Sequence, residues 1–352
     1  MDSTSKHIGF HSKYCNGIVC PNLKTDPEEY IDFLIHIGRK LTQKAVLFPV
    51  RDLEVLTMLM HRKELEEFYH IPMADLPISE ILLNKYLFYK ALNQYKFPHA
   101  RTYYIEEKSD IKKIGKEITF PCILKPFHSA SFVIEFGAKV FTAHSIEELQ
   151  YFYEKAVDKN LEVFIQEIIP GNARNMVGMN AYYDTNGVPH GVFMYRRIRE
   201  WPHGMGNGCF IESEKISELE KSLTSFIKKI GYYGIVDAEF RYDPRDNQYK
   251  LIEINSRCWM QSTLSARCGA NIPYLAYLAA LGRSLKPDIE IKDHLKWVFI
   301  GEDFRSAMKG IIDRKLSIKD WINSYRGTIE YSIVAYDDLV PFFYSLIPYY
   351  HK

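Results

Sequence analysis

The sequence predicts an α/β N-terminal lobe followed by an α+β region with a mixed or antiparallel sheet. A buried strand between two helices at 31–69 is typical of a parallel sheet. Two strand–turn–strand patterns, at 175–199 and 236–255, instead indicate antiparallel hairpins. The 352 residues are enough for two or three lobes around more than one core.

In the N-terminal lobe, predicted at 1–78, residues 45–50 form the buried strand and 31–41 and 53–69 the helices. Nothing before residue 30 resembles a first strand with a glycine-rich turn. The lobe is therefore either reduced or lacks its opening segment. A helix at 79–95 is expected next, with Ser79 as its N-cap.

A small unit is expected at about 102–170. Ser145 and Glu148 form the S-x-x-E pattern of a capping box, and Pro170-Gly171 ends the last strand. The expected strands are 101–105, 122–125, 139–142 and 163–168, the helices are 109–116 and 145–158, and 127–138 is an irregular loop.

A larger unit is expected at about 171–290, where Gly231 ends one helix. Strands are predicted at 175–183, 191–199, 236–242 and 249–255, helices at 216–230 and 272–281, and a glycine-rich loop at 201–208. Residues 291–352 are expected to form a tail packed on the body.

Composition and charge exclude several classes of protein. Lys+Arg number 45 and Asp+Glu 44, so the net charge of +1 gives no footprint for nucleic acid, and we expect no such partner. The six cysteines form no C-x-x-C pair, which favours reduced thiols over disulfides or zinc.

The chain shows no targeting signal. Its first twenty residues lack the apolar core of a signal peptide, and the apolar stretch at 339–350 is too short to span a bilayer. We expect a cytoplasmic protein without a transmembrane segment. A peripheral membrane contact by the tail is the weaker alternative.

The hairpin at 236–255 carries the clearest chemical signal. Alternation puts Glu253, Asn255 and Arg257 on one face, and a turn centred near Asp246 places Glu239 opposite Glu253. Paired carboxylates repel each other unless a cation offsets the repulsion. Mg²⁺ prefers such oxygen ligands. A solvated acidic face is an equally good interpretation of the hairpin alone, and a one-residue register shift would move Glu239 to the other face.

Basic residues add a candidate anion site. Lys125 ends a predicted strand, where a lysine can place its charge on a phosphate, and Arg197 and Arg199 precede the glycine-rich loop. Taken singly, each is more simply an exposed strand residue, and the same holds for Lys85 and Lys139. The chain contains no P-loop, no G-x-G-x-x-G fingerprint and no G-x-S-x-G elbow.

Taken in order, these segments resemble the ATP-grasp superfamily, and most of all its carboxylate–amine ligases, which include D-aspartate ligase-like and capsule-associated enzymes. The resemblance covers roughly residues 40–285. It rests on NKYLFYKAL, PCILKP, AKVFTAHSIEEL, FIQEIIPG, YRRIREWPHGMGNG, GYYGIVDAEFRYD and LIEINSRCW. The E-I-N-x-R string, with a glutamate on the preceding strand, is the most specific part.

The resemblance implies an ATP-grasp fold and an ATP- and Mg²⁺-dependent ligase. Such an enzyme joins a carboxylate to an amine through an acylphosphate and releases ADP and phosphate. Two alternatives stay open: an inactive ATP-binding or partner-binding module, and a small-molecule kinase that stops at phosphoryl transfer. The implied partners are amino-acid-like carboxylate and amine substrates and one or two Mg²⁺ ions, with Mn²⁺ as a substitute. A homodimer is left open.

The resemblance also implies a role for each candidate residue. Lys85, Lys125 and Lys139 bind the nucleotide together with a hinge of Gln166, Glu167, Ile168 and Ile169; Glu239, Glu253 and Asn255 bind the metal; Arg257 stabilises the acylphosphate, and Arg197 and Arg199 hold the acceptor. One departure is the loop FHSASFVIEFGA, which has few glycines for a phosphate-covering flap.

Overall fold

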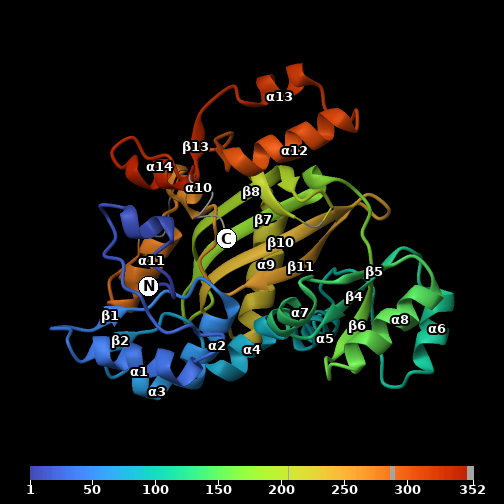
Figure 1. Cartoon of the computed structure of the whole chain (residues 1–352), viewed down its shortest axis with the longest axis horizontal. Helices are drawn as coiled ribbons and strands as arrows, with labels where there is room; N and C mark the ends of the chain where they lie inside the picture. Colours follow the sequence, from blue (N-terminus) through green and yellow to red (C-terminus); the bar gives the residue numbers. More distant parts are fainter. Residues whose placement is uncertain (205, 286–289, 347–352) are drawn as a thin grey trace.

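Sheets of two, four and seven strands organise the described part of the chain (Figure 1). The computed structural model describes residues 1–204, 206–285 and 290–346. The predicted mixed α/β architecture is confirmed, with parallel pairing in the N-terminal lobe and antiparallel hairpins in the largest sheet. Residue 205 of the predicted glycine-rich loop and residues 347–350 of the apolar stretch lie outside the described ranges.

The N-terminal lobe is a parallel two-stranded sheet with helices around it. The predicted strand 45–50 is shorter, because Pro49 has no N–H to donate and the last backbone bond is Leu47 N to His70 O at 3.0 Å. The predicted helix 53–69 is two shorter helices that end at Met60 and Leu65, and it is wrong after Leu65, since the buried Tyr69 continues into a strand. The elements are η1 Ile8–His11, α1 Pro27–Gly38, β1 Ala45–Val46, α2 Asp52–Met60, α3 Arg62–Leu65 and β2 Tyr69–His70.

The predicted helix 79–95 is two helices, α4 Leu76–Leu83 and α5 Lys85–Gln94. The break comes from Asn84, whose Oδ1 accepts from the N–H groups of Tyr86 and Leu87 and so caps α5. Ser79 is not an N-cap. It is buried inside α4 and donates to the Ala74 carbonyl at 2.8 Å.

The four-stranded sheet has the order β3-β6-β4-β5. The predicted loop 127–138 is wrong, because Phe132 and Phe136, one helical turn apart, pack against each other edge to face and against Phe141, and so stabilise a helix. Half of the capping box forms: Ser145 Oγ accepts from Glu148 N, whereas the Glu148 carboxylate accepts from His144 N. The elements are β3 Thr102–Tyr104, α6 Asp110–Glu117, β4 Cys122–Pro126, α7 Ser129–Phe136, β5 Phe141–Ala143, α8 Ile146–Val157 and β6 Val163–Glu167.

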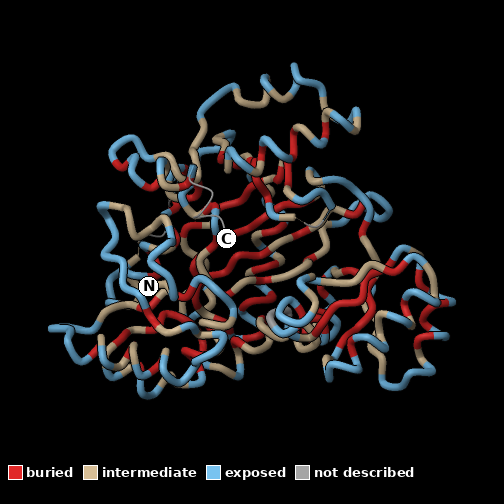
Figure 2. Tube along the Cα trace, in the orientation of Figure 1, coloured by how far each residue is buried: buried red, intermediate tan, exposed pale blue. Residues whose placement is uncertain are grey.

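The seven-stranded sheet has the order β11-β10-β7-β8-β9-β12-β13, so two strands from the predicted tail extend its edge. Its central strands are largely buried (Figure 2). One face packs on α4, α5 and α9, and the other partly on α10 and α11. The elements are η2 Ala173–Asn175, β7 Met176–Tyr183, β8 Pro189–Trp201, β9 Asn207–Ser213, α9 Ser217–Ile230, β10 Gly234–Asp243, β11 Gln248–Asn255, α10 Ser262–Arg267, α11 Ile272–Ala280, β12 Lys296–Val298, α12 Ile300–Ile312, α13 Ile318–Ser324, β13 Ile329–Tyr331 and α14 Val340–Ser345.

All six cysteines are free thiols, as the sequence predicts. Across 1–204, 206–285 and 290–346, no helix has the length and apolarity needed to cross a membrane.

Gly231 ends α9 in the left-handed region, with φ +72°. Gly231→Ala should lower the free energy of unfolding by about 1 kcal/mol, because a Cβ disfavours this conformation. Urea unfolding checks this. Gly301→Ala is the matched control: Gly301 lies inside α12 with open space around its Cα, so the same change should leave stability equal or higher. Equal losses in both variants would contradict the argument.

Candidate functional site

One face of the seven-stranded sheet carries rows of polar side chains that run across several strands. The predicted register is confirmed, with Glu239 paired to Glu253 and Asp237 to Asn255. Continuing into β7 and β8, one row is Asn255, Asp237, Asn180 and Phe193, and the next is Glu253, Glu239, Gly178 and Tyr195. Gly178 is required there, because a Cβ would lie 2.2 Å from the Tyr195 ring.

The paired carboxylates each have a cation of their own. Lys85 Nζ donates to Glu253 Oε2 at 3.0 Å, and Arg197 Nη2 donates to Glu239 Oε2 at 3.3 Å. The Lys85 charge lowers the pKa of Glu253 to about 2. Burial and the adjacent Glu253 raise the pKa of Glu239, against the opposing charge of Arg197. Lys85 and Arg197 thus meet the acidic pair from an α-helix and from a strand of the same sheet.

Lys125 is a buried ammonium at the end of β4. Within the described residues it has neither a carboxylate partner nor a hydrogen bond, and its Nζ lies 5.8 Å from the centre of the Tyr89 ring. Burial, and then the charge of Lys85, lower its pKa to about 7. Lys139 is exposed before β5, and its charge acts on both Glu239 and Glu253. An anion bound between these lysines would relieve the cost of the buried charge.

The predicted hinge divides into two parts. Gln166 Nε2 donates to Thr102 Oγ1 at 2.9 Å within the small sheet, and Glu167 pairs at 2.9 Å with Arg245 in the β10–β11 turn of the large sheet, so both side chains already have partners. For Ile168 and Ile169, the described chain supplies no hydrogen-bond partner to the peptide N–H or C=O. Their backbone is therefore available to the edge of a bound base.

Arg257 connects the hairpin to the N-terminal lobe. Its Nε donates to Asp52 Oδ1 at 2.6 Å, and its Nη2 donates to Asn255 Oδ1 at 3.2 Å. Asn255 Nδ2 donates in turn to Asp237 at 3.0 Å, and Asn180 Nδ2 donates to the other oxygen of Asp237 at 2.7 Å. Burial, and then the nearby Glu239, raise the pKa of Asp237 to about 7.

Sequence reasoning gave no role to Asp52, Asp237 or Asn180. The hairpin register could have found Asp237, because it places this residue beside Asn255. Asp52 lies 205 positions from Arg257, and no local pattern signals that contact.

The structure separates the two predicted acceptor arginines. Arg197 reaches Glu239, whereas Arg199 donates to Asp303 at 2.6 and 3.1 Å. Asp303 is fully buried on α12 and also accepts from Tyr325 and Trp321. A register shift between Arg197 and Arg199 explains why residues two apart have different surroundings.

The proposed metal ligands are two carboxylates and one amide. In the described part of the chain, no group of three His, Cys, Asp or Glu side chains forms a metal site. Glu239, Glu253 and Asn255 nevertheless offer only oxygen atoms on adjacent positions, which fits a hard cation such as Mg²⁺ that keeps further sites for phosphate.

Comparisons with known proteins find similar sequences over much of the chain. The profile of the carbamoyl-phosphate synthase L chain, ATP binding domain, matches residues 208–287. D-aspartate ligase of Enterococcus faecium is 27% identical over 276 residues, which cover 74% of this chain and 65% of that protein. The chain is thus similar to ATP-grasp proteins. It spans under two thirds of the length of this relative, and 19% of a carbamoyl phosphate synthase large chain from Schizosaccharomyces pombe at 22% identity.

Solved structures show a similar fold. Biotin carboxylase from Campylobacter jejuni gives a TM-score of 0.65 at 16% identity, covering 83% of this chain and 67% of that one. L-amino acid ligase from Bacillus licheniformis gives 0.60 at 16% identity, covering 78% and 66%. The biotin carboxylase domain dimer of Hydrogenobacter thermophilus 2-oxoglutarate carboxylase, solved with MgADP, ADP and bicarbonate, gives 0.60 at 16% identity, covering 75% and 60%.

Lys125→Met should stabilise the ligand-free protein near pH 6, because it removes a buried charge without a counter-ion. Between pH about 7 and 10.5 the unfolded chain holds a proton that the folded Lys125 has lost, so wild-type stability rises with pH relative to the variant. The variant's advantage should therefore shrink as the pH rises. Urea unfolding at several pH values measures this.

We expect MgATP to raise the melting temperature of the wild type, and the same variant should lose this thermal shift. Lys221→Met, at an exposed position of α9, is the control and should change neither property. A variant less stable than wild type at pH 6 would rule out the uncompensated charge.

Proposed function

We propose that this ATP-grasp protein is an ATP- and Mg²⁺-dependent ligase that joins a carboxylate to an amine through an acylphosphate, releasing ADP and phosphate. The observation that carries the proposal is the Glu239–Glu253 pair, held by Lys85 and Arg197, beside Lys125, for which the described residues supply no partner. The named relatives D-aspartate ligase and L-amino acid ligase support amino-acid-like substrates.

In this proposal, Glu239, Glu253 and Asn255 hold one or two Mg²⁺ ions, and Mn²⁺ can replace them. When bound, the metal neutralises charge on the phosphates. Lys85, Lys125 and Lys139 place their charges on the polyphosphate, and the hinge of Gln166 to Ile169 receives adenine through the free peptide groups of its last two residues. The related carboxylase domain with MgADP supports this choice of ligand.

The chemistry needs no protein nucleophile. An oxygen of the acid substrate attacks the γ-phosphorus as the bond to ADP breaks, and the amine nitrogen then attacks the acyl carbon as phosphate leaves. Charge spreads over oxygens in both steps, so catalysis is mostly positioning and electrostatic stabilisation. Arg257 presents a guanidinium beside Asn255 and would face the developing oxyanion.

The two acceptor arginines differ in what they can do. Arg197 donates to Glu239 of the acidic pair, and we propose that it contacts the acyl or acceptor group. Arg199 already satisfies buried Asp303, and an acceptor could reach it only by opening that ion pair. We therefore propose that Arg199 mainly holds α12 against β8.

The domain limits also remain proposals: an N-terminal lobe at 1–78, an ATP-grasp domain at 79–290 and a C-terminal tail at 291–352. The ATP-grasp domain would contain a small subdomain at about 102–170 and a larger one at about 171–290. β12 and β13 integrate part of the last segment into the main sheet. Six free thiols support a cytoplasmic location. The dimer of the related carboxylase domain keeps a homodimer under consideration.

A coupled ADP-release screen of amino acids in pairs, with Mg²⁺, tests the function. Release that requires both an acid and an amine supports the ligase. Release with the acid alone, and a stable phosphorylated product, would make the protein a kinase. ATP binding without release for any pair would favour an inactive module.

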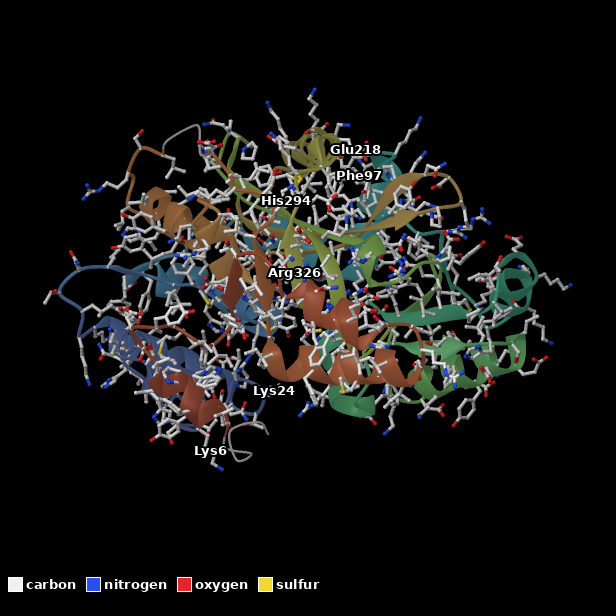
Figure 3. All side chains as sticks on the ribbon, turned by 90° about the horizontal axis from the view of Figure 1, so that it is seen from above. Lys6, Lys24, Phe97, Glu218, His294 and Arg326 are labelled. Atoms are coloured by element: carbon white, nitrogen blue, oxygen red, sulfur yellow. The ribbon has the colours of Figure 1, made fainter. Side chains whose placement is uncertain are left out.

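Glu253→Gln should reduce ADP release at least about 100-fold, because the site loses a metal carboxylate and Lys85 loses its partner. Circular dichroism should show an unchanged fold. Glu218→Gln, at an exposed position on α9 (Figure 3), makes the same chemical change outside the site and should keep full activity. Full activity in Glu253→Gln would contradict the proposal that Glu253 binds the metal.

Asp52→Asn should raise the KM of the acid about tenfold and change the KM of ATP little, because Asp52 orients Arg257 rather than the nucleotide. Steady-state kinetics with each substrate varied in turn measures the split. Asp52→Glu should recover part of the loss, and exposed Asp32→Asn should have no effect. Equal changes in both KM values would count against this role.

A further inference from the structure

Arg241 is a half-buried arginine on the site face that the proposed chemistry does not use. It lies on β10 two residues after Glu239, and the unbroken register with β7 pairs it to Met176. Phe240 between them points into the core on the opposite face. Arg241 and Glu239 therefore project on the same side of the sheet.

The charge of Arg241 has no acid partner within ion-pair distance in the described residues, and its Nε is buried without a hydrogen-bond partner. Its Nη2 donates to the Gly171 carbonyl at 2.8 Å. The charges of Glu200 and Arg197 act on Arg241 in opposite directions. A guanidinium in this setting can still accept a ligand on the surface that the described residues leave uncovered.

The position of Arg241 along the strand indicates which part of a bound nucleotide it would contact. Same-face residues on a strand are about 7 Å apart. In the proposed function Glu239 marks the phosphate and metal end, and Gly171 lies two residues after Ile169, the last residue of the proposed hinge. A nucleotide whose base lies on the hinge and whose last phosphates reach Glu239 must pass over Arg241 with its nucleoside.

We propose that Arg241 binds the nucleoside part of the nucleotide, with its guanidinium plane against the purine. This inference rests on the proposed ATP function. The polyphosphate already has Lys85, Lys125 and Lys139, whose charges act on the Glu239–Glu253 pair. Arg241, fixed at one edge by the Gly171 carbonyl, presents a planar cation, which stacks on aromatic faces better than an ammonium does.

Calorimetric titration of Arg241→Ala with AMP, ADP, ATP and inorganic tripolyphosphate, each with Mg²⁺, tests this. Affinity for the three nucleotides should fall by a similar factor, about five- to tenfold, and tripolyphosphate binding should stay unchanged. Arg241→Lys should not restore affinity, because it keeps the charge and loses the plane. Exposed Arg283→Ala is the charge-matched control and should bind like wild type.

Unchanged nucleotide affinity in Arg241→Ala would overturn the inference. So would a loss that grows with the number of phosphates and extends to tripolyphosphate, because that pattern marks a phosphate contact. Should Arg241→Ala not fold, Arg241→Met keeps the apolar stem and gives the same comparison. If the wild type itself binds no ATP, the proposed function fails. If the wild type binds ATP and the variant binds it equally well, only the role proposed for Arg241 is refuted.

Discussion

The repulsion between Glu239 and Glu253 is the constraint on which the site depends. The β10–β11 register sets these carboxylates directly opposite each other, where like charges weaken a sheet. Lys85 comes from a helix that precedes the small sheet, and Arg197 from a strand two places away in the large one. The repulsion in the acidic pair is therefore offset only when the helix that carries Lys85 and the strand that carries Arg197 have both packed around it. The same packing brings Lys125 into place.

Arg257 extends this dependence to the N-terminal lobe. Its guanidinium joins Asp52 on α2 to Asn255, and Asn255 is oriented in turn by Asp237 and Asn180. The proposed metal ligand Asn255 and the proposed catalytic residue Arg257 thus share one hydrogen-bond chain across β11, β10 and β7. Such chains fix side-chain orientation more tightly than any single contact does.

The hairpin register and the free thiols could be predicted, because a short polar turn and strict alternation leave few other arrangements. The N-terminus of α5 could not, since good helix formers stand on both sides of Asn84 and only its side-chain cap decides the break. The α7 helix depended on Phe141 outside it. Arg197 and Arg199 looked equivalent because a strand irregularity leaves no mark in the sequence. Asp52 and Asp303 were missed because long-range ion pairs have no local pattern.

The buried pair of Arg199 and Asp303 also bears on how the chain matures during synthesis. Its two members are 104 residues apart, so β8 leaves the ribosome well before its counter-ion is made. A buried arginine without that carboxylate carries a penalty of several kcal/mol. The large sheet can therefore pair its first strands early, but it reaches its final stability only when α12 docks. The last segment of the chain thus acts as the closing step of folding for a site built almost entirely by residues before it.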